Sequence, residues 1–345
     1  MGLQQLCSSR RARVLGLICA AIIGVVVIYI VFTLLTGGGQ MQFAVELIPS
    51  PRTRVGTRCH WDVASQSLYY CDVNGNDSAI LRYDYKEDKV YAAGIAGENV
   101  TPFVIPIADA TNEFAVGLGR RVGRVQWDGK SPKATLKGIV FEVDSDKPGN
   151  RFNAAKADPA GRFYGGTMDS DDGFNKASGK VFRYVKGEGV TKVLDNIFIS
   201  NGMAWDEKLN QFYYIDTGRF DVKGYDYNPS NGNISNEKVI IDYSKNGKHP
   251  GFAPDGLTID TDGNLYVTFF GGSRVDKIDP RNGKILLEIP IPAKQVTAVA
   301  FGGPNLDILY VVTASIEDEK TESSGCLYRI TGLGTKGFPG VKVII

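Results

Sequence analysis

Four short polar stretches of this 345-residue chain carry side chains suited to catalysis or metal binding: "NRFN" (150–153), "TMDSDD" (167–172), "ISNGMAW" (199–205) and "APDGL" (253–257). Within them, Asn201 and Asp255 each precede a glycine and offer amide or carboxylate oxygens, the ligands that a hard divalent cation prefers. Because the two residues come from separate segments, they would form a partly open metal site. The alternative is that Asn201-Gly202 and Asp255-Gly256 are simply tight turns.

Beyond residue 40 the chain contains a sequence repeat, and these stretches lie within it. An apolar entry, a turn rich in Asp, Gly or Asn, and an aromatic residue or Leu that starts a β-rich run recur at intervals of 44 to 53 residues. The runs begin at Leu68, Phe114, Phe163, Phe212, Leu265 and Leu309, and a second hairpin-like phrase follows each. Two hairpins per repeat predict a four-stranded blade, so the pattern predicts an all-β, six-bladed β-propeller over residues 43–345.

The last repeat is short and ends soon after Ile330, whereas a spare strand-like segment, residues 43–48, precedes the first repeat. We expect this segment to complete the last blade, because ring closure leaves no sheet edge unpaired. Ligand-binding residues should then lie at one mouth of the central channel, where loops and innermost strands of different blades converge.

Longer phrases around the same stretches resemble one protein family. They are "NRFNAAKADPAGRFYGGTM", "ISNGMAWDEKLNQFYYID", "PDGLTIDTDGNLYV" and "ITGLGTKG", and they resemble the regucalcin, gluconolactonase and luciferin-regenerating-enzyme family in the expected order. The resemblance implies a propeller that hydrolyses sugar lactones and holds one divalent cation through a Glu, an Asn and an Asp. The implied cation is Ca²⁺ or Zn²⁺, with Mg²⁺ or Mn²⁺ as alternatives, and some animal members are described as calcium-binding regulators.

Carried over position by position, the resemblance makes Asn201 and Asp255 metal ligands, with Asp255 also the catalytic proton acceptor. Arg151 and Asn153 match residues that contact substrate, and Asp171 aligns with a substrate-contacting acid of some members. In this chemistry the metal would polarise the lactone carbonyl and lower the pKa of a bound water. Arg151 would hold substrate oxygens with its forked donors.

The stretch "GTRCHWD" (56–62) departs from the family, whose first ligand lies in the phrase Gly-Glu-x-Pro-x-Trp. Aligning the Gly and the Trp places Thr57 at the position of the Glu and Cys59 at that of the Pro. The loss of an acidic ligand should weaken a Ca²⁺ site, because affinity depends on ligand charge. In a regular strand Thr57 and Cys59 share one face and His60 points to the other, so His60 is badly placed to replace the acid unless the backbone bulges.

The N-terminal segment contains 22 uncharged residues, Val14 to Leu35, which as a helix would be about 33 Å long and could cross a bilayer. Three arginines precede this run, and no Lys or Arg follows it until Arg52. The positive-inside rule therefore predicts a cytosolic basic tail (1–13), a transmembrane signal-anchor helix (14–35) and a linker (36–42). The expected protein is a single-pass type II membrane protein whose propeller is lumenal or extracellular. The alternative is a cleaved signal peptide.

Cys59 and Cys71 would lie on neighbouring antiparallel strands if residues 62–67 form a turn. A disulfide between them is then feasible in an oxidising compartment, and two free buried thiols are the alternative. The net charge of +1 gives no sign of a nucleic-acid-binding surface, so we expect no nucleic-acid partner.

Two principal functions follow from these observations. The first is a metal-dependent hydrolase of a sugar lactone or related ester, with Thr57 altering the metal site. The second is a non-catalytic propeller that binds calcium, another metal or a small ligand; it is favoured by Thr57, by Cys59, and by Ala154, which stands where the family commonly has Asp. A kinship to strictosidine-synthase-like propellers would also explain an N-terminal span, but the "NRFN" and "PDG" phrases fit it less well.

Overall fold

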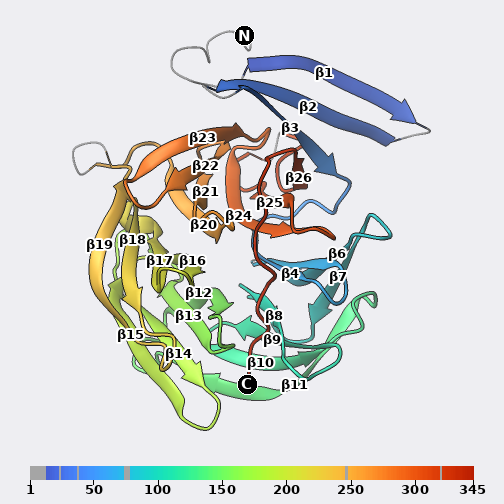
Figure 1. Ribbon diagram of the computed structural model, residues 1–345. Coiled ribbons are helices and arrows are strands. Elements are labelled where there is room, and N and C mark those ends of the chain that lie inside the picture. The colour runs from blue at the N-terminus through green and yellow to red at the C-terminus, as the bar shows by residue number, and fades with distance from the viewer. Residues whose placement is uncertain (1–12, 23–24, 37–38, 74–77, 245–247, 319–320) are drawn as a thin grey trace.

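The computed structural model of the chain describes residues 13–22, 25–36, 39–73, 78–244, 248–318 and 321–345. Within these ranges the protein is all-β, and the one helix is the short 3₁₀ helix η2 (Thr217–Arg219). The strands form a propeller-like ring of antiparallel meanders around a common centre (Figure 1).

Five hydrogen-bonded sheets make up this ring. The eight-stranded sheet contains two meanders. The first consists of β4 (Gly56–Asp62), β5 (Ser67–Asp72), β6 (Ala79–Asp84) and β7 (Lys89–Ile95). The second consists of β8 (Val104–Pro106), β9 (Glu113–Leu118), β10 (Arg121–Gln126) and β11 (Lys133–Glu142). Only two residue pairs of β7 and β11 join them, in parallel.

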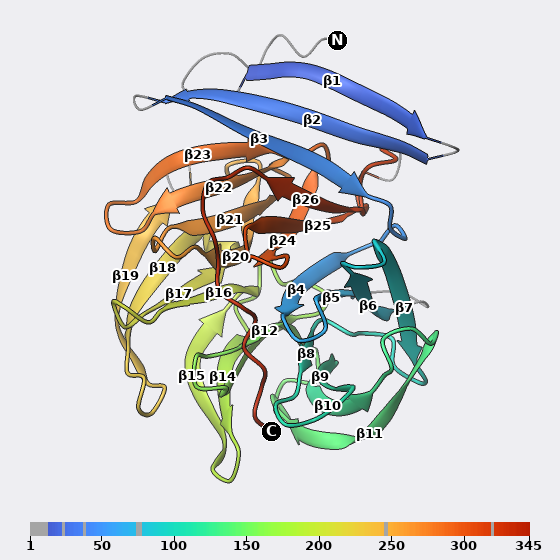
Figure 2. The same cartoon turned by 45° about the vertical axis from the view of Figure 1, so that its right-hand side comes forward.

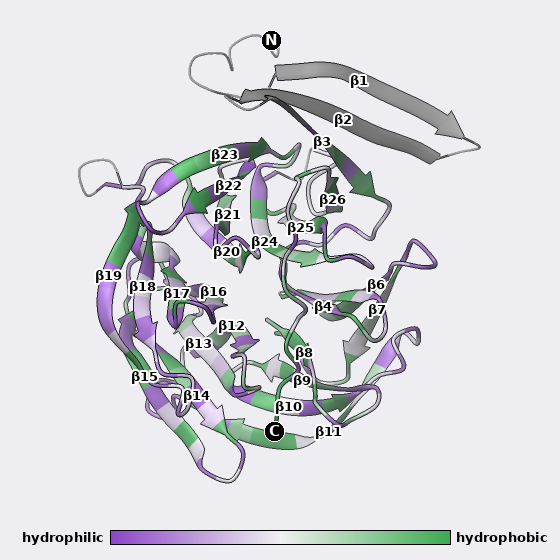
Figure 3. Ribbon diagram, in the orientation of Figure 1, coloured by the Kyte–Doolittle hydropathy of each residue, from purple (hydrophilic) through white to green (hydrophobic). Residues whose placement is uncertain are grey.

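Three further sheets have four strands each. They are β12 (Asn150–Ala157), β13 (Phe163–Asp169), β14 (Gly179–Val185), β15 (Gly189–Ile197); β16 (Ser200–Asp206), β17 (Gln211–Asp216), β18 (Asp221–Tyr227), β19 (Ile234–Asp242); and β20 (Ala253–Ile259), β21 (Leu265–Phe270), β22 (Arg274–Asp279), β23 (Lys284–Pro290). Hydrophobic and hydrophilic residues are interspersed along these strands (Figure 3), as expected where alternate side chains point to opposite faces.

The fifth sheet joins the two ends of the ring. It contains β24 (Gln295–Gly302), β25 (Ile308–Ala314) and β26 (Leu327–Thr331), followed by β3 (Gly39–Ile48), β2 (Val25–Thr36) and β1 (Arg13–Ile22). The pairing of β26 with β3 runs from Leu327–Ile48 to Thr331–Ala44, which confirms the prediction that residues 43–48 complete the last meander.

The predicted transmembrane helix over residues 14–35 is wrong. Strands β1 and β2 occupy this segment, and β2 pairs with β3 outside the ring (Figure 2). Among the described residues, no helix is long and apolar enough to span a bilayer. The predicted type II membrane topology and the membrane contact through that helix are therefore not supported.

The composition of this segment explains the error. Eight of the 12 residues of β2 are Val, Ile or Thr, whose branched side chains favour strands. An apolar run alone does not distinguish a buried strand from a helix, and the free edge of β3 provides the hydrogen-bonding partner for a strand.

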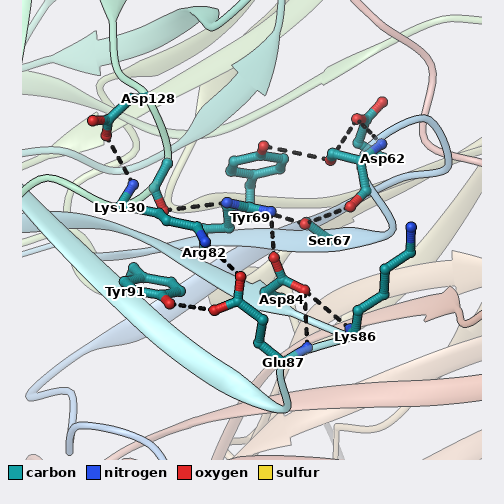
Figure 4. Close-up of polar contacts among 12 residues, drawn as sticks. Asp62, Ser67, Tyr69, Arg82, Asp84, Lys86, Glu87, Tyr91, Asp128 and Lys130 are labelled. Carbon is teal, nitrogen blue, oxygen red and sulfur yellow. Dashed lines mark hydrogen bonds and ion pairs between the residues drawn. The ribbon is translucent and has the colours of Figure 1, made fainter.

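Partly buried polar contacts fix the β6–β7 turn of the first meander (Figure 4). The Arg82 guanidinium donates to Ser67 Oγ at 2.9 Å and to Asp84 Oδ2 at 2.6 Å. The other carboxylate oxygen of Asp84 accepts backbone N–H groups of Lys86 and Glu87. These bonds hold the β6–β7 turn against β5.

The C-terminal strap, residues 335–345, crosses one face of the ring (Figures 1 and 2), on the side where the first strands of the meanders end. Its backbone N–H groups donate to carbonyl oxygens of four separate segments, those of Leu306, Trp61, Pro106 and Gly161. The strap therefore links parts of the ring that are far apart in the sequence.

Candidate functional site

The first strands of the meanders, β4, β8, β12, β16, β20 and β24, line one cavity of about 130 Å³ along the channel. We call them the inner strands. Arg58 and Asn201 lie where their strands begin, whereas Phe338 and Val341 of the C-terminal strap lie at the opposite end of the cavity. The cavity is therefore covered by the strap at one end and lies beneath the polar residues at the other.

Register shifts interrupt five inner strands at the same level, close to their starts. The shifts fall between Thr57 and His60, Phe152 and Ala154, Ser200 and Met203, Pro254 and Leu257, and Val296 and Ala298. A β-bulge re-aims the side chain of the extra residue. The residues at these bulges include Arg58, Asn153, Asn201 and Asp255, which explains why segments distant in sequence converge here.

A chain of hydrogen bonds joins three of the predicted residues. Arg151 Nη1 donates to Asn153 Oδ1 at 2.9 Å, and Asn153 Nδ2 donates to Asn201 Oδ1 at 3.4 Å and to the Ser200 carbonyl at 3.0 Å. Asn201 Nδ2 donates to Thr217 Oγ1, and Thr217 donates onward to the Pro254 carbonyl at 2.7 Å. These contacts lead from β12 through β16 to the residue before Asp255.

Asp255 is buried and paired with a residue that the sequence-based predictions omit. Arg58 Nη1 lies 3.3 Å from Asp255 Oδ1, and Arg58 Nε donates to the Asn153 carbonyl at 3.1 Å. The second carboxylate oxygen, Oδ2, has no hydrogen-bond partner among the described residues. Asp255 therefore keeps one oxygen available to a ligand or a water.

Two guanidinium groups and one carboxylate set the electrostatics of the site. Burial raises the pKa of Asp255 to about 6, although the neighbouring Arg58 charge opposes the shift. Burial lowers the pKa of Arg151 to about 10, and repulsion from Arg58 adds to this effect. Only Nη1 of Arg151 has hydrogen-bond partners among the described residues, so the site has donors directed at no protein acceptor.

Further polar groups line the cavity below this level. Lys156 donates to the Met203 carbonyl at 3.0 Å, and burial lowers its pKa to about 8. Burial also raises the pKa of the Cys59 thiol to about 12 and lowers that of His60 to about 4. At neutral pH Cys59 and His60 are therefore uncharged.

The remaining predicted residue, Asp171, lies apart from this set. Asp171 is exposed on the loop after β13, and among the described residues no polar contact joins it to Arg151, Asn153, Asn201 or Asp255.

The bulge in β4 also changes the surroundings of the two cysteines. The residue opposite Cys71 is Thr57 rather than Cys59, and both cysteines are free thiols in the structure. Cys71 is buried and Cys59 is half-buried.

Arg58 is the main functional residue missing from the sequence-based predictions. It stands at an unspecified position of the family phrase, and its backbone has a left-handed φ of 48°, which no alternating pattern reveals. One feature of the sequence could have indicated it: Arg58 directly follows Thr57, which stands where the family phrase has Glu. Thr217 was also missed, because no motif marks it.

The residues present do not fit the divalent cation that the family resemblance implies. Thr57 supplies no carboxylate, and the Arg58 guanidinium lies against the one carboxylate that remains. The second guanidinium, that of Arg151, adds to the positive charge. Among the described residues, no three His, Cys, Asp or Glu side chains gather in a way that could hold a metal ion.

Comparisons with known proteins agree with this architecture. Residues 55–315 match the family model described as "SMP-30/Gluconolactonase/LRE-like region". Regucalcin of Danio rerio is 33% identical over 300 residues, which are 86% of this chain and 96% of that protein. A solved structure of a luciferin-regenerating enzyme is 37% identical in sequence and has a TM-score of 0.80. The match covers 87% of this chain and 99% of that enzyme's chain.

A calcium-binding protein, regucalcin, from Agrobacterium tumefaciens shares the fold, with a TM-score of 0.72 and 21% identity over 86% of this chain and 96% of that one. The family match extends from β4 to the end of β25 and includes all the bulged inner strands. The chain belongs to the SMP-30/gluconolactonase/LRE-like family.

Proposed function

We propose that this protein is a lactonase-type hydrolase that cleaves a sugar lactone or a related carboxylic ester. The observation that carries the proposal is the convergence of Arg151, Asn153, Asn201 and Asp255 at the starts of three inner strands, above the cavity. Family membership supports the hydrolase class, and the match to a gluconolactonase-containing family supports a sugar lactone as the substrate.

The chemistry needs a base and a group that stabilises negative charge. A water held by Asp255 Oδ2 adds to the lactone carbonyl carbon while Asp255 takes its proton. The ring C–O bond then breaks, and the same proton passes to the departing alkoxide, which leaves a hydroxy acid. With a pKa of about 6, Asp255 is mainly a carboxylate at pH 7, as a general base requires.

The guanidinium of Arg151 stabilises the developing negative charge on the carbonyl oxygen. Its Nε and Nη2 have no hydrogen-bond partner among the described residues, and forked donors of this kind match a negatively charged oxygen. Asn153 holds the other end of this guanidinium through Nη1. Asn201 in turn holds Asn153, so these two amides position the charge-stabilising group.

We also infer that the frame of this site is a six-bladed propeller. The eight-stranded sheet divides into two four-stranded meanders at the two residue pairs that join β7 to β11. The six inner strands then each begin one blade, and all six contribute residues to the cavity.

An activity measurement tests the proposal. Asp255→Asn should reduce the rate of hydrolysis of glucono-δ-lactone by at least ~100-fold, because a positioned general base contributes about 10²–10⁴-fold. Asp171→Asn is the matched control, since Asp171 is exposed and lies outside the contact network, and it should retain the wild-type rate. Full activity in a folded Asp255→Asn protein would rule out the proposed role of Asp255.

The second candidate is a non-catalytic propeller that binds a small ligand in the same site. The observation that favours it is the Arg58–Asp255 ion pair, which ties one oxygen of the proposed base to a protein group. This candidate predicts that wild-type protein binds the hydrolysis product, D-gluconate, in calorimetry but does not accelerate lactone hydrolysis over buffer.

A further inference from the structure

The Arg58 side chain reaches across the channel from β4. It begins in the bulge between Thr57 and His60, and its guanidinium contacts Asn153 of β12 and Asp255 of β20. The side chain is only 10% exposed, so its charge is held within the protein rather than in solvent. One positive group thus bridges three inner strands at the level of the bulges.

The position of this charge coincides with the residues that would hold a cation in the family. Asp255 and Asn201 are the two expected ligands that remain in the chain. Arg58 is paired with Asp255, and Asn153, which accepts the Arg58 Nε bond at its carbonyl, also donates to Asn201 Oδ1. The guanidinium therefore already neutralises the carboxylate that a divalent cation would need.

We propose that Arg58 is a built-in cation that replaces the divalent metal of this site. It supplies the positive charge at Asp255, and it excludes Ca²⁺, Zn²⁺, Mg²⁺ and Mn²⁺ by pairing with Oδ1 and neutralising the charge of the carboxylate. The claim that hydrolysis proceeds without a divalent metal rests on the proposed function. The claim that Arg58 prevents metal binding does not rest on it.

Two adjacent residues would together account for the absence of a metal site. Thr57 stands where the family phrase has an acid, and Arg58 places a basic side chain directly after it. Thr57→Glu alone should therefore not create a metal site, because the Arg58 guanidinium remains against Asp255. Only the double change, Thr57→Glu with Arg58→Gly, supplies two free carboxylates and the Asn201 amide.

The backbone permits the second substitution. Arg58 has a φ of 48°, in the left-handed region that glycine adopts without steric cost. Arg58→Gly should therefore preserve the bulge while it removes the charge. Asn also tolerates this conformation, so Arg58→Asn is a second variant with which to repeat the test if the first does not fold.

The test is calorimetric titration of the full chain with each of the four metal ions. Wild type, Thr57→Glu and Arg58→Gly should show no micromolar binding, whereas the double variant should bind Ca²⁺ with a Kd of about 10 µM or lower, within the range of protein calcium sensors. Micromolar binding by wild type or by Thr57→Glu alone would overturn the proposal. A folded double variant that binds none of the ions would also overturn it.

Activity with a chelator separates this inference from the proposed function. Wild-type hydrolysis of glucono-δ-lactone should be unchanged in EDTA, and its loss would overturn the claim of metal independence. If wild type has no lactonase activity but the double variant alone binds metal, the proposed function fails and the replacement of the metal by Arg58 stands.

Discussion

At the scale of single residues, one extra residue in β4 decides which side chains reach the channel. In a regular strand Thr57 and Cys59 would share a face opposite to His60. The bulge breaks this alternation, so Arg58 meets Asp255 and Thr57 lies opposite Cys71. Register shifts also occur at Asn153, Asn201 and Asp255. The site residues therefore lie in the irregular parts of the strands.

His60 should make the stability of the protein depend on pH. It is buried, its Nε2 has no hydrogen-bond partner among the described residues, and burial lowers its pKa from 6.5 to about 4. The folded state thus binds this proton less readily than the unfolded state. Stability that is present above pH 6.5 is lost as the pH falls towards 4, by about 2 kcal/mol between pH 7 and pH 5.

Urea unfolding at pH 7 and pH 5 measures this contribution. His60→Gln keeps a polar side chain but does not titrate, so its loss of stability between the two pH values should be about 2 kcal/mol smaller than that of wild type. Equal losses in both proteins would show that His60 is not the responsible group.

At the scale of elements, β3 closes the ring by pairing with β26. Phe43 and Val45 of β3 are 1% exposed and pack into the core of the last sheet. On the other face, Arg329 of β26 forks onto both carboxylate oxygens of Glu46, at 2.6 and 2.7 Å. Burial on one face and an ion pair on the other fix the register of this closing strand.

Truncation of Phe43 should weaken the closure. Phe43→Ala removes a fully buried ring and should lower the free energy of unfolding by about 3 to 5 kcal/mol. The neighbouring Gln42 is exposed, so Gln42→Ala should change it by no more than about 0.5 kcal/mol. Urea unfolding measures the free energy of unfolding of both variants. Equal losses in the two variants would contradict the packing role of β3.

At the scale of the whole molecule, the C-terminal strap ties the ring across the channel. Gly340 N donates to the Trp61 carbonyl at 3.0 Å, and Lys342 pairs with Asp62 at 3.3 Å, so the strap binds the end of β4 whose beginning carries Arg58. Gly340 also packs against the His60 ring. The strap thus closes the cavity opposite the site.

A side chain at Gly340 should disturb this contact. A Cβ there would lie 2.6 Å from His60 ring atoms and from the Trp61 carbonyl oxygen, so the strap would have to move. Gly340→Ala should therefore cost about 1 to 3 kcal/mol. Gly138→Ala is the control, because a Cβ at Gly138 meets nothing within 4 Å. If thermal unfolding midpoints fall equally in the two variants, the strap contact is not a source of stability.

The β-rich repeat, the closing strand and the family could be predicted from the sequence alone, and so could the grouping of Arg151, Asn153, Asn201 and Asp255 as candidates for one site. These properties follow from local patterns and short motifs, which can be recognised in the linear sequence without knowledge of the fold. The bulges, the Arg58–Asp255 pair between residues 197 positions apart, and the strand structure of residues 25–36 became visible only in the folded chain. A bulge depends on the partner strand, and an ion pair depends on charges that the ring brings together. The conformation of an apolar run depends on the sheet edge available to it.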